Sequence, residues 1–299
     1  MKKIFFIFII VIILSGCSSK SEDKLIVGLI KPSLNHLPFD LGLEIGTLNR
    51  SDYIIKNFSS GWETNEALIS GKIDVAIMPF TYIWTGVSKG KKVKIISFFE
   101  RESDGIIAKK EIQTLEDLQG KKMGVLRAST LDIFAEILAE DHNIDFEMIY
   151  FRTPMDMASA LRSGRIDALS FYVPPIFKFD EEFHIIHWYS EDYPFHTCCD
   201  IAATETAIQK KLPKIKKFLK GLEKSTDEMN NSPQVAYEAA RTFFNLSLRD
   251  AKKSLYHTKF VMEFTDVQKK FEQKVIKKMI EKGYIENEVN PDDVYFEVK

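Results

Sequence analysis

The chain has 299 residues, of which 45% are hydrophobic and 12% aromatic, and its formal net charge at pH 7 is −2. This apolar content excludes a disordered chain, and a mildly acidic balance without a basic stripe argues against a nucleic-acid binder. The length favours two domains over one.

The first segment has the pattern of an export signal. A positively charged start precedes an apolar run over 4–14, and two small residues then lead to Cys17. The run is shorter than the ~20 apolar residues that a bilayer-spanning helix needs, as is typical of a secretory signal peptide. We expect residues 1–16 to be removed and residues 17–24 to form a polar tether. The alternative is an anchor helix with a chance cysteine.

Two sequence features then occur twice, in the same order and at nearly the same offset. Ala-Leu-Ile-Ser-Gly-Lys-Ile-Asp at 67–74 returns as Ala-Leu-Arg-Ser-Gly-Arg-Ile-Asp at 160–167. Val-Gly-Leu-Ile-Lys-Pro-Ser at 27–33 aligns with Met-Gly-Val-Leu-Arg-Ala-Ser at 123–129. Each copy predicts a half with the order strand, helix, strand, helix, strand, in which the glycine ends a helix.

The repeat predicts an α/β fold with two similar lobes. Because the strands are continuous apolar runs, each lobe is expected to hold a mainly parallel sheet flanked by helices. We expect the first lobe over 25–107 and 200–299, and the second lobe over 108–199. The C-terminal part is expected to pack on the first lobe, the alternative being a separate helical domain. Its predicted helices span about 205–229, 233–243, 247–257 and 265–282.

Three motifs together resemble a known family. They are the signal ending in Leu-Ser-Gly-Cys at 14–17, which resembles the bacterial lipobox, the Ser-Gly-Lys-Ile-Asp-Val-Ala segment at 70–76, and Leu-Glu-Asp-Leu-Gln-Gly-Lys-Lys-Met-Gly-Val at 115–125. They resemble the substrate-binding proteins of ABC importers, in the branch that binds nitrate, alkanesulfonates, taurine and thiamine precursors. The resemblance implies a two-lobed periplasmic-binding-protein type II fold with a ligand cleft that closes about a hinge.

The resemblance also implies a location and partners. The protein would lie outside the cytoplasm, held on the membrane by lipid at Cys17, and would deliver its ligand to ABC permease and ATPase subunits. The ligand would be a planar heterocycle, such as a thiamine-related pyrimidine, or a small organic or inorganic anion. We expect a monomer without cofactor, metal, catalytic residue or nucleic acid. The alternatives are a sensory lipoprotein with the same cleft, and an enzyme of the pyrimidine-synthase type.

Polar residues at the end of the first strand of each lobe are the first candidate ligand contacts. Each of these loops carries a cation and then a hydroxyl, so that facing lobes would supply matching donors, and the second loop begins a helix whose N–H groups suit an anion. The alternative is that these are solvated loop charges and a helix cap. The candidates are Lys31, Ser33, Asn35 and His36 in the first lobe, and Arg127, Ser129 and Thr130 in the second.

Residues after the repeated strands form the second group of candidates. Flat rings at the edge of a cleft can enclose a planar ligand between them. The alternative is core packing, since the chain has 23 Phe residues. The candidates are Phe80, Thr81, Tyr82 and Tyr172.

The segment His-Thr-Cys-Cys-Asp at 196–200 is expected to form a strand that returns to the first lobe. Its adjacent cysteines are expected on opposite faces of that strand, as small apolar side chains without a disulfide or a metal. His196, at the crossing between the lobes, is a further candidate for the cleft.

Overall fold

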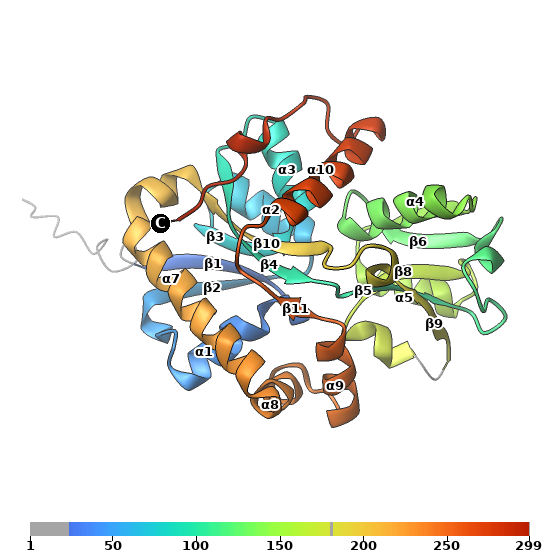
Figure 1. The fold of residues 1–299 in the computed structure, drawn as a ribbon, viewed down its shortest axis with the longest axis horizontal. Coiled ribbons are helices and arrows are strands. Elements are labelled where there is room, and N and C mark those ends of the chain that lie inside the picture. Colours follow the sequence, from blue (N-terminus) through green and yellow to red (C-terminus); the bar gives the residue numbers. More distant parts are fainter. Residues whose placement is uncertain (1–23, 180–181, 299) are drawn as a thin grey trace, which may run out of the picture.

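The computed structural model describes residues 24–179 and 182–298. The export signal, Cys17 and nearly all of the tether lie outside these residues. Two lobes lie side by side, each with one β-sheet covered by helices (Figure 1). Within the described ranges, we find no helix with the length and apolar character that a bilayer crossing requires.

The first lobe contains a six-stranded sheet with the order β11-β4-β10-β3-β1-β2, and the second a five-stranded sheet with the order β7-β6-β8-β5-β9. The first sheet comprises β1 Leu25–Ile30, β2 Tyr53–Phe58, β3 Val75–Pro79, β4 Val93–Arg101, β10 Thr197–Thr204 and β11 Lys259–Phe260. The second comprises β5 Asp104–Ala108, β6 Lys122–Leu126, β7 Glu147–Phe151, β8 Ala168–Tyr172 and β9 His184–Trp188.

The two sheets have the same pattern of strand pairing. β1 pairs in parallel with β2 and β3, and β6 pairs in parallel with β7 and β8. The next strand is antiparallel in both sheets, β10 beside β3 and β5 beside β8. This correspondence is the duplicated α/β half that the repeated sequence predicts.

Helices cover both sheets and form the C-terminal part. They are α1 Leu37–Ile45, α2 Gly61–Ile69, α3 Phe80–Ser88, α4 Thr130–His142, α5 Pro154–Arg162, α6 Tyr189–Asp192, α7 Glu205–Asn231, α8 Pro233–Phe244, α9 Leu248–Tyr256 and α10 Asp266–Glu281. The long helix α7 packs on the first lobe, as expected: the ring of Phe218 lies 6.0 Å from that of Phe39 and 5.8 Å from that of Tyr53, measured between centroids.

The repeated Ser-Gly-basic-Ile-Asp segments have the same structure in both lobes. The glycine of each copy has a φ of +72°, a left-handed conformation that ends the preceding helix. The aspartate then accepts a backbone N–H at the start of the corresponding strand of its lobe, β1 in the first and β6 in the second. Asp74 accepts from Ile26 at 2.8 Å, and Asp167 accepts from Lys122 at 3.0 Å. The repeat therefore fixes the start of each sheet.

Two segments cross between the lobes, at 102–103 before β5 and at 193–196 before β10. They are bonded to each other, since the N–H of Glu102 donates to the carbonyl of His196 at 3.2 Å. Glu102 and Phe195 both have positive φ, 64° and 60°, a conformation that is uncommon for residues other than glycine.

The lobe boundaries differ from the expected ones by a few residues. Residues 104–107, expected in the first lobe, belong to β5 and pair within the second sheet. Residues 197–199, expected in the second lobe, begin β10 and pair within the first sheet. An apolar run indicates a buried strand but not the sheet with which it pairs, because the partner is distant in sequence.

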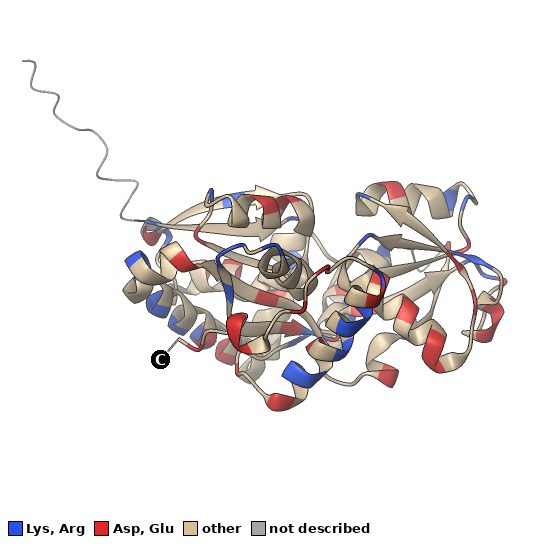
Figure 2. Ribbon diagram, turned by 90° about the horizontal axis from the view of Figure 1, so that it is seen from above, with Lys and Arg blue, Asp and Glu red and all other residues tan. Residues whose placement is uncertain are grey.

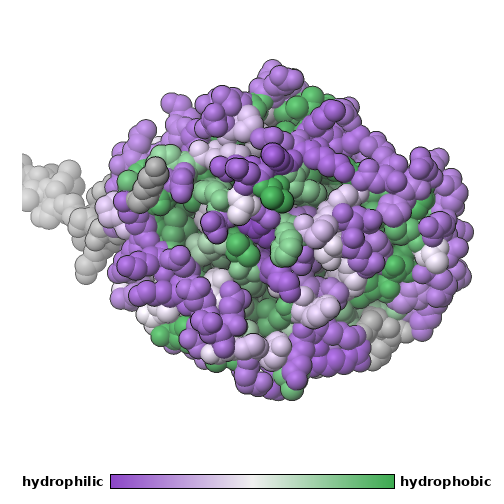
Figure 3. Space-filling model, in the orientation of Figure 1, coloured by the Kyte–Doolittle hydropathy of each residue, from purple (hydrophilic) through white to green (hydrophobic). Residues whose placement is uncertain are grey.

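The surface carries charges of both signs. Lys, Arg, Asp and Glu are interspersed over both lobes (Figure 2). Hydrophilic side chains cover much of the face in Figure 3, with smaller hydrophobic areas among them.

Candidate functional site

A cavity lies between the lobes, with about 630 Å³ of space when the open solvent at its mouth is included, and we call it the interlobe cavity. The last residues of two parallel strands from each lobe line it: Ile30 and Pro79 from β1 and β3, and Leu126 and Tyr172 from β6 and β8. Ligands of parallel sheets bind beyond the carboxyl ends of the strands. The duplicated topology therefore forms the cavity by bringing two such edges together.

The loops that begin the repeated helices form two further walls. Ser59, Ser60 and Gly61 precede and open α2, while Arg152 and Pro154 hold the matching positions before α5. The hydroxyl of Ser60 caps α2 by accepting the N–H of residue 63 at 3.2 Å.

Gly61 leaves room for the ring of Tyr82. A Cβ atom at this position would lie 2.6 Å from Cε2 of Tyr82, much closer than side chains approach each other. Glycine thus allows the tyrosine ring to lie against the first turn of α2, where both residues line the cavity.

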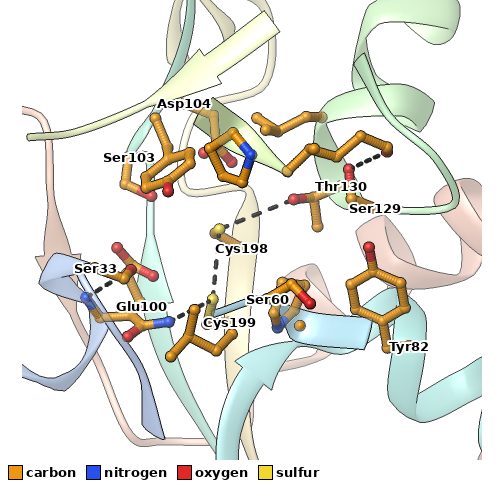
Figure 4. Close-up of a pocket in the computed structure, with 18 of the residues that line it drawn as sticks. Ser33, Ser60, Tyr82, Glu100, Ser103, Asp104, Ser129, Thr130, Cys198 and Cys199 are labelled. Carbon is orange, nitrogen blue, oxygen red and sulfur yellow. Dashed lines mark hydrogen bonds between the residues drawn. The ribbon is translucent and has the colours of Figure 1, made fainter. Parts of the chain in front are cut away.

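Carboxyl and thiol groups lie together on the wall near the crossing segments (Figure 4). Glu100 is near the end of β4, Asp104 begins β5, and Cys198 and Cys199 are adjacent on β10. The pairing of β10 with β4 is irregular at the cysteines, and their Sγ atoms lie 3.6 Å apart. The prediction that the two thiols point to opposite faces is therefore wrong, because a bulged strand does not alternate its side chains.

The two carboxyl groups are almost completely buried, with exposed fractions of 3% for Glu100 and 1% for Asp104. Burial raises the pKa of Glu100 to about 7. Burial and the nearby Glu100 raise the pKa of Asp104 to about 8. Ser103 and Cys198 lie close enough to Asp104 to lower its pKa slightly, yet neither carboxylate oxygen has a hydrogen bond of good geometry.

Glu100, Cys198 and Cys199 are the side chains of the described residues that come nearest to a metal-ligand set. One ligand atom from each lies within 4.8 Å of the others. Burial raises the pKa of the Cys199 thiol to about 12. The pKa of Cys198 is raised as well, chiefly by its hydrogen bond with Cys199. Burial and this hydrogen bond thus favour the thiol form of both cysteines.

Half of the predicted site residues reach the interlobe cavity. Two of these residues form hydrogen bonds between different elements of the cavity wall. The amide of Asn35 donates to Sγ of Cys199 at 3.4 Å, and the hydroxyl of Tyr82 donates across the lobes to the carbonyl of Arg127 at 3.3 Å. The predicted residues that line the cavity are Ser33, Asn35, Tyr82, Ser129, Thr130 and Tyr172.

The two predicted cations do not line it. Nζ of Lys31 pairs with the carboxylate of Asp40 at 3.3 Å. The guanidinium of Arg127 lies over the rings of Tyr150 and Tyr284, at 5.9 and 5.5 Å from their centroids. Lys31 is thus paired within its own lobe, whereas Arg127 contacts one ring of the second lobe and one of the C-terminal part, and the expected pair of facing cations is absent from the described cavity walls.

The other predicted residues away from the cavity are buried in the protein. Nδ1 of His36 lies 2.9 Å from Asp40, and Phe80 and Thr81 belong to the interior of the first lobe. His196 is fully buried, packs edge-on against Phe134, and has Nδ1 2.9 Å from the carbonyl of residue 193. Strand ends place only some side chains toward the cleft, and the rest complete the core.

The segment Ser-Thr-Leu-Asp at 129–132 has the sequence of a capping box, but none forms at the start of α4. The hydroxyl of Ser129 donates to the carbonyl of Leu126 at 2.6 Å and makes no cap. The carboxylate of Asp132 instead accepts the N–H of Ala128 at 2.8 Å, one residue before the expected position.

Several lining residues were not predicted, although the sequence holds a signal for some of them. Ser59 and Arg152 precede the repeated helices at matching offsets, so the repeat itself could have identified both loops. Glu100 and Asp104 lie in a charged stretch that indicated only a joint between lobes. Nothing in the local pattern showed that two of these acids would be buried.

Comparisons with known proteins agree with this geometry. The profile of the family described as NMT1/THI5 like matches residues 54–236. The profile of the prokaryotic membrane lipoprotein lipid attachment site matches residues 1–18. The second match confirms the predicted attachment site, with Cys17 as its cysteine, and the chain is held on the membrane outside the cytoplasm. A search of curated protein sequences finds no match.

Solved structures with low sequence identity share the fold. The periplasmic aliphatic sulphonate binding protein SsuA from Escherichia coli has a TM-score of 0.79 at 15% identity, covering 92% of each chain. A ligand binding component of an ABC-type import system from Staphylococcus aureus has 0.79 at 17%, covering 92% of this chain and 97% of that one. The nitrate-binding protein NrtA from Synechocystis PCC 6803 has 0.74 at 12%, covering 91% and 86%.

Proposed function

Because the chain belongs to the NMT1/THI5-like family and encloses a cavity between two lobes, we propose that it is the extracytoplasmic solute-binding lipoprotein of an ABC importer. It captures a small molecule in the interlobe cavity and delivers it to permease and ATPase subunits. The observation that carries this proposal is the cavity itself, lined by the strand ends of both lobes. Sites of this kind form preferentially at domain interfaces.

The ligand is a small planar molecule. Tyr82 from the first lobe and Tyr172 from the second line the cavity, and apolar side chains such as Leu126 and Leu131 complete its walls. This lining suits the flat faces of a heterocycle, such as a thiamine-related pyrimidine. A small anion has less support, because the two expected cations contact side chains outside the cavity lining.

A thermal-shift screen of the purified protein against vitamins, heterocycles, sulfonates and small anions tests the proposal. A ligand at 100 times its Kd adds about 2.7 kcal/mol to the free energy of unfolding. For the compound found, we expect Tyr172→Ala to weaken binding at least tenfold and Tyr172→Phe to keep most of it. The Trp62→Ala variant, which removes an exposed side chain outside the cavity lining, is the matched control.

The alternatives differ in what happens to the ligand. An importer subunit releases the compound unchanged, and deletion of the protein abolishes its uptake by cells. A sensory lipoprotein would leave uptake intact and change gene expression. An enzyme of the pyrimidine-synthase type would convert the compound, which mass spectrometry of the recovered ligand would detect.

A further inference from the structure

We propose that the interlobe cavity selects a cationic ligand, a protonated amine or amidinium group on a planar ring, which donates hydrogen bonds to the carboxyl groups of Glu100 and Asp104. This inference rests on the proposed function, because it names the ligand class of the same cavity.

The two acids belong to different lobes. Glu100 lies on β4 of the first sheet and Asp104 begins β5 of the second, with one crossing segment between them. Both line the cavity, and Figure 4 shows their carboxyl groups on the same wall, near the thiols of β10. A positive group that contacts both carboxyls would therefore hold the lobes together. Ligand binding and lobe closure would be coupled through this contact.

No charged partner within the described residues neutralises these acids. Both oxygens of Asp104 lack a hydrogen bond of good geometry. Nε2 of His196 lies 4.0 Å from Asp104, but burial lowers the pKa of this histidine to about 4, so that it is neutral at pH 7. The guanidinium of Arg101 donates to carbonyls of residues 261 and 263 and interacts with Asp200 and Glu272.

The remaining groups around the acids are uncharged or distant. The thiols of Cys198 and Cys199 and the phenol of Tyr172 have raised pKa values, chiefly from burial for Cys199 and Tyr172 and from the bond between the thiols for Cys198. Arg152 is the one basic residue among the described lining residues, and its side chain is exposed at the rim. The inner part of the cavity thus offers acceptors and potential negative charge.

A buried carboxylate without a partner costs several kcal/mol, so burial shifts both groups toward the protonated form in the ligand-free protein. A cation with N–H donors supplies the missing charge and hydrogen bonds at once. An anion would face repulsion from any ionised carboxyl, and a neutral ring without N–H donors would leave the oxygens of Asp104 unpaired.

Proton release follows from this pairing. Binding of a cation favours the ionised carboxylates, whose pKa values of about 7 and 8 in the free protein then fall. Below pH 7 the ligand must displace protons. The affinity for a permanently charged cation should therefore rise with pH between about 6 and 8, up to tenfold per pH unit for each proton released.

Three isosteric probes test the proposal: benzamidine, which is cationic, benzamide, which is neutral, and benzoate, which is anionic. Titration calorimetry of the purified full-length lipoprotein should give at least tenfold tighter binding of benzamidine than of benzamide, and no binding of benzoate. The Glu100→Gln and Asp104→Asn variants should each lose most of this preference and the pH dependence. Lys31→Gln, whose charge lies outside the cavity, is the control and should change neither.

The outcomes separate this inference from the proposed function. Tighter binding of benzamide or benzoate would overturn the cationic class and leave a small-molecule binding protein. Absence of binding for all three probes, and for every compound of the wider screen, would count against the proposed function itself. Should the amide variants fail to fold, the pH dependence of benzamidine binding to the unmodified protein decides: an affinity that does not rise between pH 6 and 8 overturns the proposal.

Discussion

Asp74 and Asp167 hold matching positions at the start of the two sheets. Each accepts a strand N–H and also a lysine, Lys211 at 2.7 Å for Asp74 and Lys109 at 2.6 Å for Asp167. Both are partly buried, so each carboxylate exchanges water for fixed donors on folding. These contacts explain why the aspartate recurs in the repeated sequence: it is structural and lies away from the interlobe cavity.

We therefore expect Asp74→Ala and Asp167→Ala each to lower the free energy of unfolding by about 2 kcal/mol, since each change leaves a backbone N–H and a lysine without their acceptor. Urea denaturation measures this loss. Asp52→Ala, which removes a surface pair with Lys217 at 2.6 Å, is the control and should cost less than about 1 kcal/mol. Equal effects of the three substitutions would refute the structural role.

Asp104 makes stability depend on pH. Its pKa is raised to about 8 in the folded protein, above that of an unfolded aspartate. The folded state therefore binds more protons than the unfolded state between about pH 4 and 8, and this group's contribution to stability falls as pH rises through that window. We expect Asp104→Asn to remove the contribution, so that the variant becomes more stable than the parent at pH 8.

Urea denaturation of both proteins at pH 5, 6.5 and 8 measures this effect. Other buried groups also titrate, with raised pKa values for Glu100 and Glu272 from burial and a lowered one for His196 from the same cause. They are present in both proteins, so the difference between the two curves reports mainly on Asp104. If the difference in the free energy of unfolding between the two proteins stays constant with pH, the carboxyl of Asp104 is not protonated in the folded state.

At the scale of elements, α10 connects the two lobes. It packs on α3 and β10 of the first lobe and on α4 of the second. Three lysines spaced by four residues along it face acids of α4. Lys274 pairs with Asp141 at 3.1 Å, Lys278 with Glu140 at 2.7 Å, and Lys282, just after the helix, with Glu136. We call these pairs the α10–α4 ladder.

The pairs of the ladder differ in burial, which predicts unequal contributions. Lys282 is 13% exposed and also lies 3.7 Å from the fully buried Asp132, whereas Lys274 is 50% exposed. We expect Lys282→Met to lower the free energy of unfolding by about 2–3 kcal/mol, because it leaves a buried carboxylate unpaired. Lys274→Met should cost less than about 1 kcal/mol. Chemical denaturation of both variants is the measurement, and equal losses would contradict this ranking.

Much of the arrangement of elements could be predicted from the sequence. The two copies of Ser-Gly-basic-Ile-Asp and their apolar flanks predicted two alike α/β halves, and periodicity located the helices after residue 204 to within a few residues. The bulge at Cys198 and Cys199 could not be predicted, because it depends on pairing with β4, a hundred residues earlier in the chain. The same holds for the assignment of β5 to the second sheet.

The position of the cavity could be predicted from the sequence, but the charge of the side chains that line it could not. Parallel strands end at one edge, so the residues after them were bound to lie near a cleft. Whether Arg127 or Glu100 points into that cleft depends on rotamers and on competing partners, such as the rings of Tyr150 and Tyr284. Sequence patterns indicate which positions of an element are buried. They do not indicate which of several nearby partners a flexible cationic side chain contacts.

At the scale of the whole molecule, contacts on two sides of the cavity hold the lobes together. On one side is the α10–α4 ladder. On the other, His257 after α9 stacks on Trp188 at the end of β9, with ring centroids 3.6 Å apart. Between them, the hydroxyl of Tyr82 reaches the carbonyl of Arg127. Opening the lobes means breaking the ladder, the ring stack and the Tyr82–Arg127 hydrogen bond.

This arrangement predicts that salt opens the ligand-free protein. The acids of the ladder are partly exposed, and the Debye length falls from ~10 Å at 0.1 M salt to ~3 Å at 1 M, so the ladder weakens while the ring stack does not. Small-angle X-ray scattering should show a radius of gyration that grows with salt, and Lys282→Met should show the growth already at low salt. Saturation with benzamidine should restore the compact form, since Glu100 and Asp104 then share one cation across the lobes. A radius of gyration that is indifferent to salt and to the probe would mean that the lobes behave as one rigid body.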